Sequence, residues 1–105
     1  MNVEFVYDKR LGISLPVLHV EWEELSREEQ QSIIHQWEEI RGKIPDRILE
    51  LEKQIKEKQE LLATEEHFES SCRLNCEISE LASIINDLNI WFRTTQEYEI
   101  ERQHQ

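Results

Sequence analysis

The sequence predicts a mainly α-helical protein: a long antiparallel helical hairpin, one shorter helix and a small N-terminal β-hairpin. Three observations predict this fold. The 105 residues include only two Gly and two Pro, while Glu, Gln, Lys, Leu and Ile dominate, as in helices. Apolar residues recur at three- and four-residue steps in the second half, and they alternate near the start. A chain of this length buries about two thirds of its unfolded surface, so we expect one domain, residues 1–105.

The first element is a β-hairpin over residues 1–22. Its first strand would place three apolar side chains on one face, Val3, Phe5 and Tyr7. The run DKRLG then forms a turn that ends in Gly12, a residue able to adopt a positive φ. Because Pro16 lacks a backbone donor, the return strand should be an edge strand or be interrupted there.

The second element is a helix over residues 26–42. Ser26 and Glu29 have the spacing of a capping box, in which each side chain accepts a hydrogen bond from the other's backbone amide. The apolar stripe of this helix is Ile33, Ile34, Trp37 and Ile40. Gly42 fits a left-handed residue that closes the helix, and Pro45 suits the first turn of the next.

Two longer helices follow, residues 45–63 and 65–98, with a frayed tail over 99–105. The apolar positions of the first are Ile48, Leu51, Ile55 and Leu62, with Lys58 at one step of the pattern. Those of the second keep a heptad spacing: Ser71, Leu74, Ile78, Leu81, Ile85, Leu88 and Phe92. Such spacing is typical of a coiled-coil seam, so we expect the chain to reverse near residues 63–64, with Thr64 as the next N-cap. We call residues 45–83 the arm.

The far half of the last helix has a wider apolar face, because Ile84 and Trp91 lie beside the seam. A wider face requires burial from two directions. We therefore expect the β-hairpin and the first helix to cover residues 84–98.

Charge excludes some classes of function. The net charge is −11, and residues 60–101 hold ten acidic side chains against two arginines. Contacts to nucleic-acid phosphates need clustered Lys and Arg, so a nucleic-acid-binding protein is not expected. The first ten residues lack the features of a signal peptide and no apolar run is long enough to span a bilayer, which predicts a cytoplasmic location with reduced thiols.

The candidate metal and catalytic residues do not form a recognisable site. Cys72 and Cys76 lie one helical turn apart, but structural zinc needs four ligands and only His67 and Glu69 are near. Both thiols should point away from the seam. The remaining His residues are scattered over separate elements, without a nucleophile at motif spacing. We therefore predict no catalytic residues, metal or cofactor, and no enzymatic activity.

The run FESSCRLNCEISEL, residues 68–81, resembles the second half of the UVR motif. This motif is a short helical hairpin found in excision-repair nuclease subunits and in some bacterial proteolysis and stress regulators. Residues at matching positions are Phe68, Glu69, Arg73, Leu74, Glu77, Ile78, Glu80 and Leu81. The segment from Leu49 resembles the first helix, although the spacing between the two halves is about one helical turn longer than in the motif. The resemblance implies protein–protein association through the hairpin, and no phosphodiester chemistry.

The sequence therefore predicts a small acidic interaction module, an adaptor or regulator, that docks through its arm. We expect two helices alone to leave the apolar side chains near the turn uncovered, which is typical of a docking surface. The predicted interaction residues are Lys58, Leu61, Leu62, Glu65, Phe68, Ser71 and Leu74. The partner would be another protein or a second copy of the chain. The alternatives are a structural homodimer with a four-helix bundle and an acidic mimic of nucleic acid that blocks a nucleic-acid-binding protein.

Overall fold

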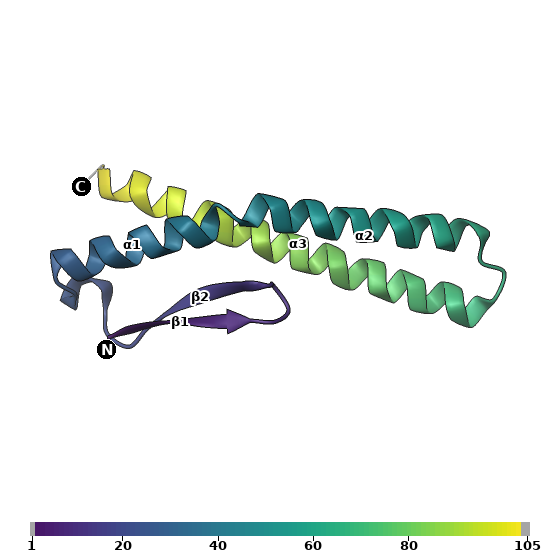
Figure 1. The fold of residues 1–105 in the computed structure, drawn as a ribbon, viewed down its shortest axis with the longest axis horizontal. Helices are drawn as coiled ribbons and strands as arrows, with labels where there is room; N and C mark the ends of the chain where they lie inside the picture. Colours follow the sequence, from purple (N-terminus) through teal and green to yellow (C-terminus); the bar gives the residue numbers. More distant parts are fainter. Residues whose placement is uncertain (1, 104–105) are drawn as a thin grey trace. The chain divides into compact units, whose positions relative to one another are not determined.

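The computed structural model describes the backbone of residues 2–103 and the side chains of residues 2–93. The elements in chain order are β1 (Val3–Asp8), β2 (Ile13–Leu18), a 3-10 turn η1 (Trp22–Glu24), α1 (Arg27–Arg41), α2 (Ile44–Thr64) and α3 (Phe68–Gln103) (Figure 1). The mainly α-helical fold with an N-terminal β-hairpin is confirmed. Contacts divide the chain into two compact units, one of residues 1–44 and one from Pro45 onward. The single domain and the mutual cover of the two parts stay predictions.

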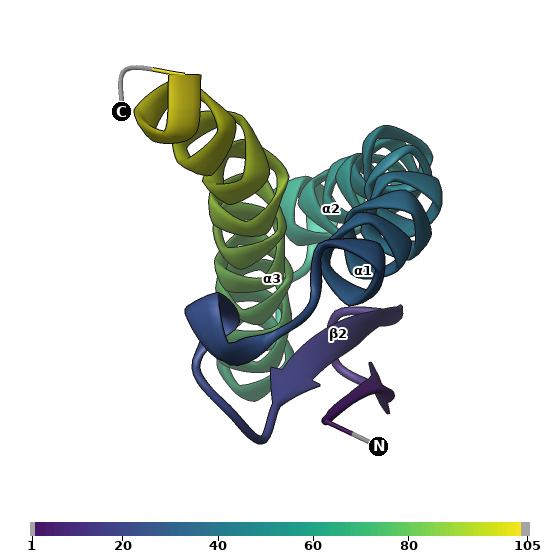
Figure 2. The same cartoon turned by 90° about the vertical axis from the view of Figure 1, so that its left-hand side faces the viewer.

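In the first unit, β1 and β2 form a two-stranded antiparallel sheet, and β2 lies beside α1 (Figure 2). Gly12 has a φ of 77°, as the turn requires, and the carboxylate of Asp8 accepts a 2.9 Å hydrogen bond from the amide of Leu11. Pro16 lies opposite Phe5. A two-stranded sheet has only edge strands, so Pro16 is on an edge as predicted.

The capping box of α1 is confirmed. The amide of Glu29 donates to the Ser26 hydroxyl, the amide of Ser26 donates to the Glu29 carboxylate, and both distances are 3.1 Å. On the predicted stripe, Ile33 and Trp37 are buried. The prediction for Gly42 was wrong, because its φ of −62° is right-handed. Its amide donates to the carbonyl of Glu38, so the chain leaves α1 without a left-handed residue and α2 begins two residues later.

In the second unit, α2 and α3 run antiparallel, joined by residues 65–67 (Figure 1). The reversal is confirmed, but it lies slightly later than predicted. Thr64 is the last residue of α2 and its hydroxyl donates to the carbonyl of Leu61, so its predicted role as the N-cap of the next helix was wrong. Helix α3 continues to Gln103 instead of ending near residue 98. Residues 104–105 of the predicted tail lie outside the described residues.

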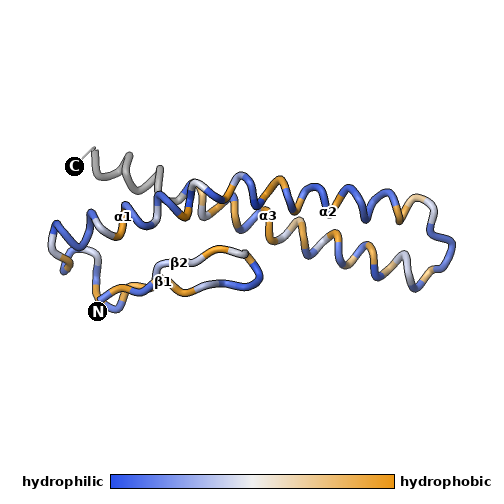
Figure 3. Tube along the Cα trace, in the orientation of Figure 1, coloured by the Kyte–Doolittle hydropathy of each residue, from blue (hydrophilic) through white to orange (hydrophobic). Residues whose placement is uncertain are grey.

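The residues at the heptad positions of α2 and α3 are buried or half-buried, as expected of a coiled-coil seam. Apolar residues recur along both helices in Figure 3. Leu51, Leu74 and Leu88 are at most 7% exposed. The half-buried members are Ile48, Ile55, Lys58, Leu62, Ser71, Ile78, Leu81, Ile85 and Phe92. Ile84 is buried and Trp91 is half-buried, so the wider apolar face of α3 is also confirmed.

Candidate docking surface at the arm tip

The arm ends in a short stretch that carries two large, exposed apolar side chains. We call residues 60–69 the arm tip: the end of α2, the connection 65–67 and the start of α3. Phe68 is 81% exposed and Leu61 is 60% exposed. Phe68 is the first residue of α3, where no preceding helical turn can cover its ring. The tip therefore presents apolar side chains directly to solvent.

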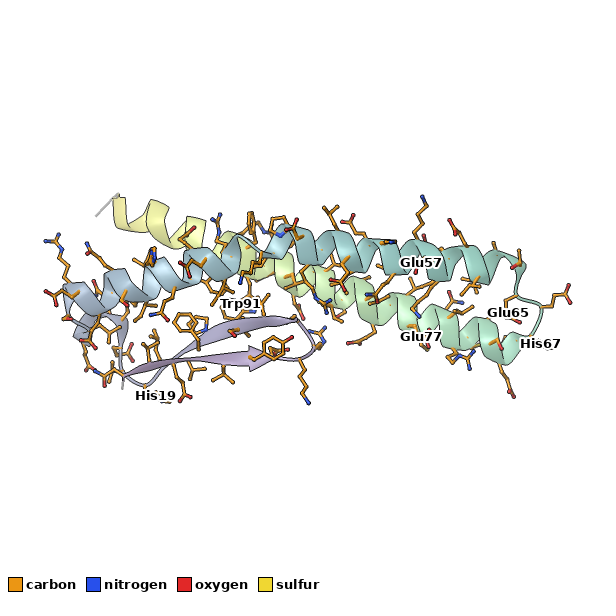
Figure 4. The ribbon with its side chains drawn as sticks, in the orientation of Figure 1. His19, Glu57, Glu65, His67, Glu77 and Trp91 are labelled. Carbon is orange, nitrogen blue, oxygen red and sulfur yellow. The ribbon has the colours of Figure 1, made fainter. Side chains whose placement is uncertain are left out.

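The connection at the tip has a defined hydrogen-bonding pattern. The amide of Glu65 donates to the carbonyl of Leu62 at 3.3 Å, which continues the last turn of α2. The carboxylate of Glu65 accepts a 3.0 Å bond from the amide of His67, and both residues are labelled at the end of the arm in Figure 4. The carbonyl of His67 then accepts from the amide of Ser71, which starts the hydrogen bonding of α3. These bonds fix the places at which the two helices end and begin.

The tip is acidic. Its ten residues include Glu60, Glu65, Glu66 and Glu69 and contain no Lys or Arg. Three of these carboxylates are exposed and that of Glu65 is half-buried. A surface of this kind attracts cations and basic side chains and repels a copy of itself.

The predicted interaction residues divide into three groups. Leu61 and Phe68 are exposed, as a docking surface requires. Leu62, Glu65 and Ser71 are half-buried. Leu74 is only 7% exposed, so the expectation that two helices cannot cover it was wrong. Leu74 lies at a heptad position of α3, which turns it toward the seam instead of toward solvent.

Lys58 has a partner inside the arm. Its Nζ lies 2.8 Å from Oε2 of Glu77, which joins α2 to α3 across the seam. The hydrogen bond from Lys58 lowers the pKa of Glu77 below its ordinary value of 4.5, with a smaller contribution from the charge of Lys58. The heptad spacing places Lys58 in the seam but does not identify Glu77 as its partner. One feature of the sequence indicates the pair: Glu77 directly precedes the seam residue Ile78, so the Glu77 carboxylate lies at the margin of the seam that contains Lys58.

The two cysteines lie outside the seam. Cys72 and Cys76 are free and exposed, as predicted from the heptad frame. Among the described residues, no group of three or more His, Cys, Asp or Glu side chains is arranged to hold a metal ion. The described helices also include none with the length and apolarity needed to cross a membrane.

No protein-family model, curated protein or solved structure matches this chain. The function is therefore inferred from the chain's own side chains, and the UVR resemblance of residues 49–81 stays a prediction.

Proposed function

We propose that this chain is a non-enzymatic interaction module whose arm tip docks onto another protein. The observation that carries the proposal is the exposure of Phe68 and Leu61 on the two sides of a three-residue connection. Burying a large apolar side chain stabilises a complex by about 1.5–3 kcal/mol. Aromatic anchors of this kind dominate the affinity of many interfaces.

The charges of the tip indicate the chemistry of the partner. An anchor ring at position 68 requires an apolar pocket on the partner, and the four surrounding glutamates favour Lys or Arg on the rim of that pocket. Two tips would repel each other, which disfavours a second copy at this surface. The partner we propose is therefore a protein with an apolar pocket and a basic rim.

The proposal is tested by comparing tip variants with a matched control on the same helix. Leu61→Asp and Phe68→Asp change the tip, while Leu49→Asp changes a leucine of nearly equal exposure, 63% against 60%, toward the other end of α2. Partners are recovered from cells of the source organism with the full chain as bait. Each protein recovered is then purified and its affinity for the four forms of the chain is measured by calorimetry.

We expect at least one purified partner whose affinity falls about 30-fold or more with Phe68→Asp, the equivalent of about 2 kcal/mol. Leu49→Asp should bind it like the wild type. The affinity of the chain for this partner should also decrease as salt concentration rises, because salt screens the attraction between the acidic tip and the basic rim. If every partner tolerates both tip substitutions, or loses equal affinity with Leu49→Asp, the tip is not the docking surface.

A further inference from the structure

The outer edge of β1 has backbone groups that β2 does not use. The amide of His19 donates to the carbonyl of Asn2 at 2.9 Å, so residues 2 and 19 form a hydrogen-bonded pair of the ladder. Such pairs alternate along antiparallel strands. With the observed register, the amides and carbonyls of Val3, Phe5 and Tyr7 point away from β2.

The two edges of the sheet differ in their capacity to accept another strand. On β2, the alternation directs the backbone of Ser14, Pro16 and Leu18 outward, and Pro16 has no amide to donate. The outward residues of β1 keep all their donors and acceptors. Along β1, the side chains of Val6 and Tyr7 are 47% and 62% exposed. An edge strand with these properties is a template for strand pairing.

We propose that β1 pairs antiparallel with β1 of a second copy of this chain, which joins two hairpins into a four-stranded sheet. The outward groups allow only registers that pair Val3, Phe5 and Tyr7 with one another. One such register places Phe5 opposite Phe5 of the second copy, on the two-fold axis, and Tyr7 opposite Val3. This pairing involves only the β-hairpin and is independent of the arm tip.

The charged side chains of β1 favour the register with Phe5 on the two-fold axis over the registers shifted by two residues. With Phe5 on the axis, the Glu4 side chain lies opposite Val6 of the second copy, and no two carboxylates are opposed. The two neighbouring registers centre on Val6, which puts Glu4 opposite Asp8, and on Glu4, which puts the two Glu4 side chains opposite each other. Like charges directly opposite each other destabilise a sheet. Glu4 contacts His19 at 2.9 Å and its side chain is still 62% exposed, so it is accessible at this edge.

The register predicts opposite effects for two substitutions of one residue. Val6→Glu places a second carboxylate opposite each Glu4, whereas Val6→Lys places an ammonium group there. Sedimentation equilibrium of the full chain should show a wild-type dimer, weakened about fivefold or more by Val6→Glu and tightened by Val6→Lys, because two cross-strand pairs change together. A wild-type monomer at all concentrations, or equal dissociation constants for the two variants, would overturn the proposal.

A second pair of variants tests the backbone edge. Tyr7→Pro removes an outward amide from β1, and Ser14→Pro removes the outward amide directly opposite on β2, at a similar cost to the hairpin. Only Tyr7→Pro should abolish the dimer. In the wild type, hydrogen exchange at the amides of Val3, Phe5 and Tyr7 should slow as concentration rises, while Ser14 should not change. A dimer that survives Tyr7→Pro but is lost with Phe68→Asp would instead be joined through the arms, contrary to the proposal.

Discussion

Phe68 and Leu74 lie within two turns of each other on α3, and their environments are opposite. Phe68 is 81% exposed, whereas Leu74 is 7% exposed. Both were predicted to belong to one docking surface, because a heptad pattern alone does not show how close to its turn a helical hairpin closes. Leu74 contributes to the stability of the arm, and Phe68 is available to a partner.

The two residues should therefore respond differently to truncation. Leu74→Ala leaves a cavity in the seam and should reduce the free energy of unfolding by about 2–5 kcal/mol. Phe68→Ala removes a solvent-exposed ring and should change it by less than about 0.5 kcal/mol. Urea unfolding followed by circular dichroism measures both values. Equal destabilisation by the two substitutions would show that Phe68 is part of the core.

At the scale of single elements, helix α1 depends on its capping box. Ser26→Ala removes the acceptor for the Glu29 amide and should cost about 1 kcal/mol of stability. Ser26→Gly is the control, because glycine at an N-cap costs only a few tenths of a kcal/mol. Thermal unfolding of the two variants compares them directly. If both variants melt like the wild type, the cap does not limit the stability of α1.

Helices α2 and α3 are linked by Lys58 and Glu77, and this link should be sensitive to pH. The pKa of Glu77 is lower in the folded chain than its ordinary value of 4.5. A lowered carboxyl pKa stabilises the fold at pH values above the unfolded pKa, and this stabilisation is lost as the pH falls through the folded pKa. Glu77→Gln should therefore be less stable than the wild type at neutral pH, and the difference should disappear in acid well below pH 4.5.

Urea unfolding of both proteins across this pH range measures the effect. Glu57→Gln, which removes an exposed carboxylate from α2, is the control for the general effect of removing negative charge from an acidic chain. A stability difference for Glu77→Gln that persists unchanged in acid would mean that its interaction with Lys58 does not depend on the carboxylate charge.

The sequence predicts these elements well where the signal is local. Ser26 and Glu29 locate the start of α1, Gly12 locates the β-turn, and the spacing from Ser71 to Phe92 identifies the buried face of α3. The errors concern positions at which neighbours in space decide the outcome. Thr64 has the side chain of an N-cap, yet α2 includes it, and the pairing of Lys58 with Glu77 joins residues 19 positions apart.

At the scale of the whole molecule, a net charge of −11 and an exposed apolar tip have complementary roles in the proposed interaction. In that proposal, charge would steer a basic partner toward the acidic tip and raise the association rate. The ring of Phe68 would then add affinity through burial in a pocket of the partner, which mainly slows dissociation. The dimer that we propose at β1 would be a separate interaction, because β1 and the arm tip belong to different units of the chain.

Photo-crosslinking shows whether Phe68 contacts a partner protein. A benzophenone side chain is placed at position 68 in one protein and at position 49 in another, since Leu49 is also exposed but lies outside the tip. Irradiation in the source cells should link position 68, and not position 49, to one protein that binds the purified wild-type chain and loses affinity for Phe68→Asp. Crosslinks that are identical at both positions, or absent at position 68 while the protein remains bound to its partners, would show that Phe68 does not contact the partner.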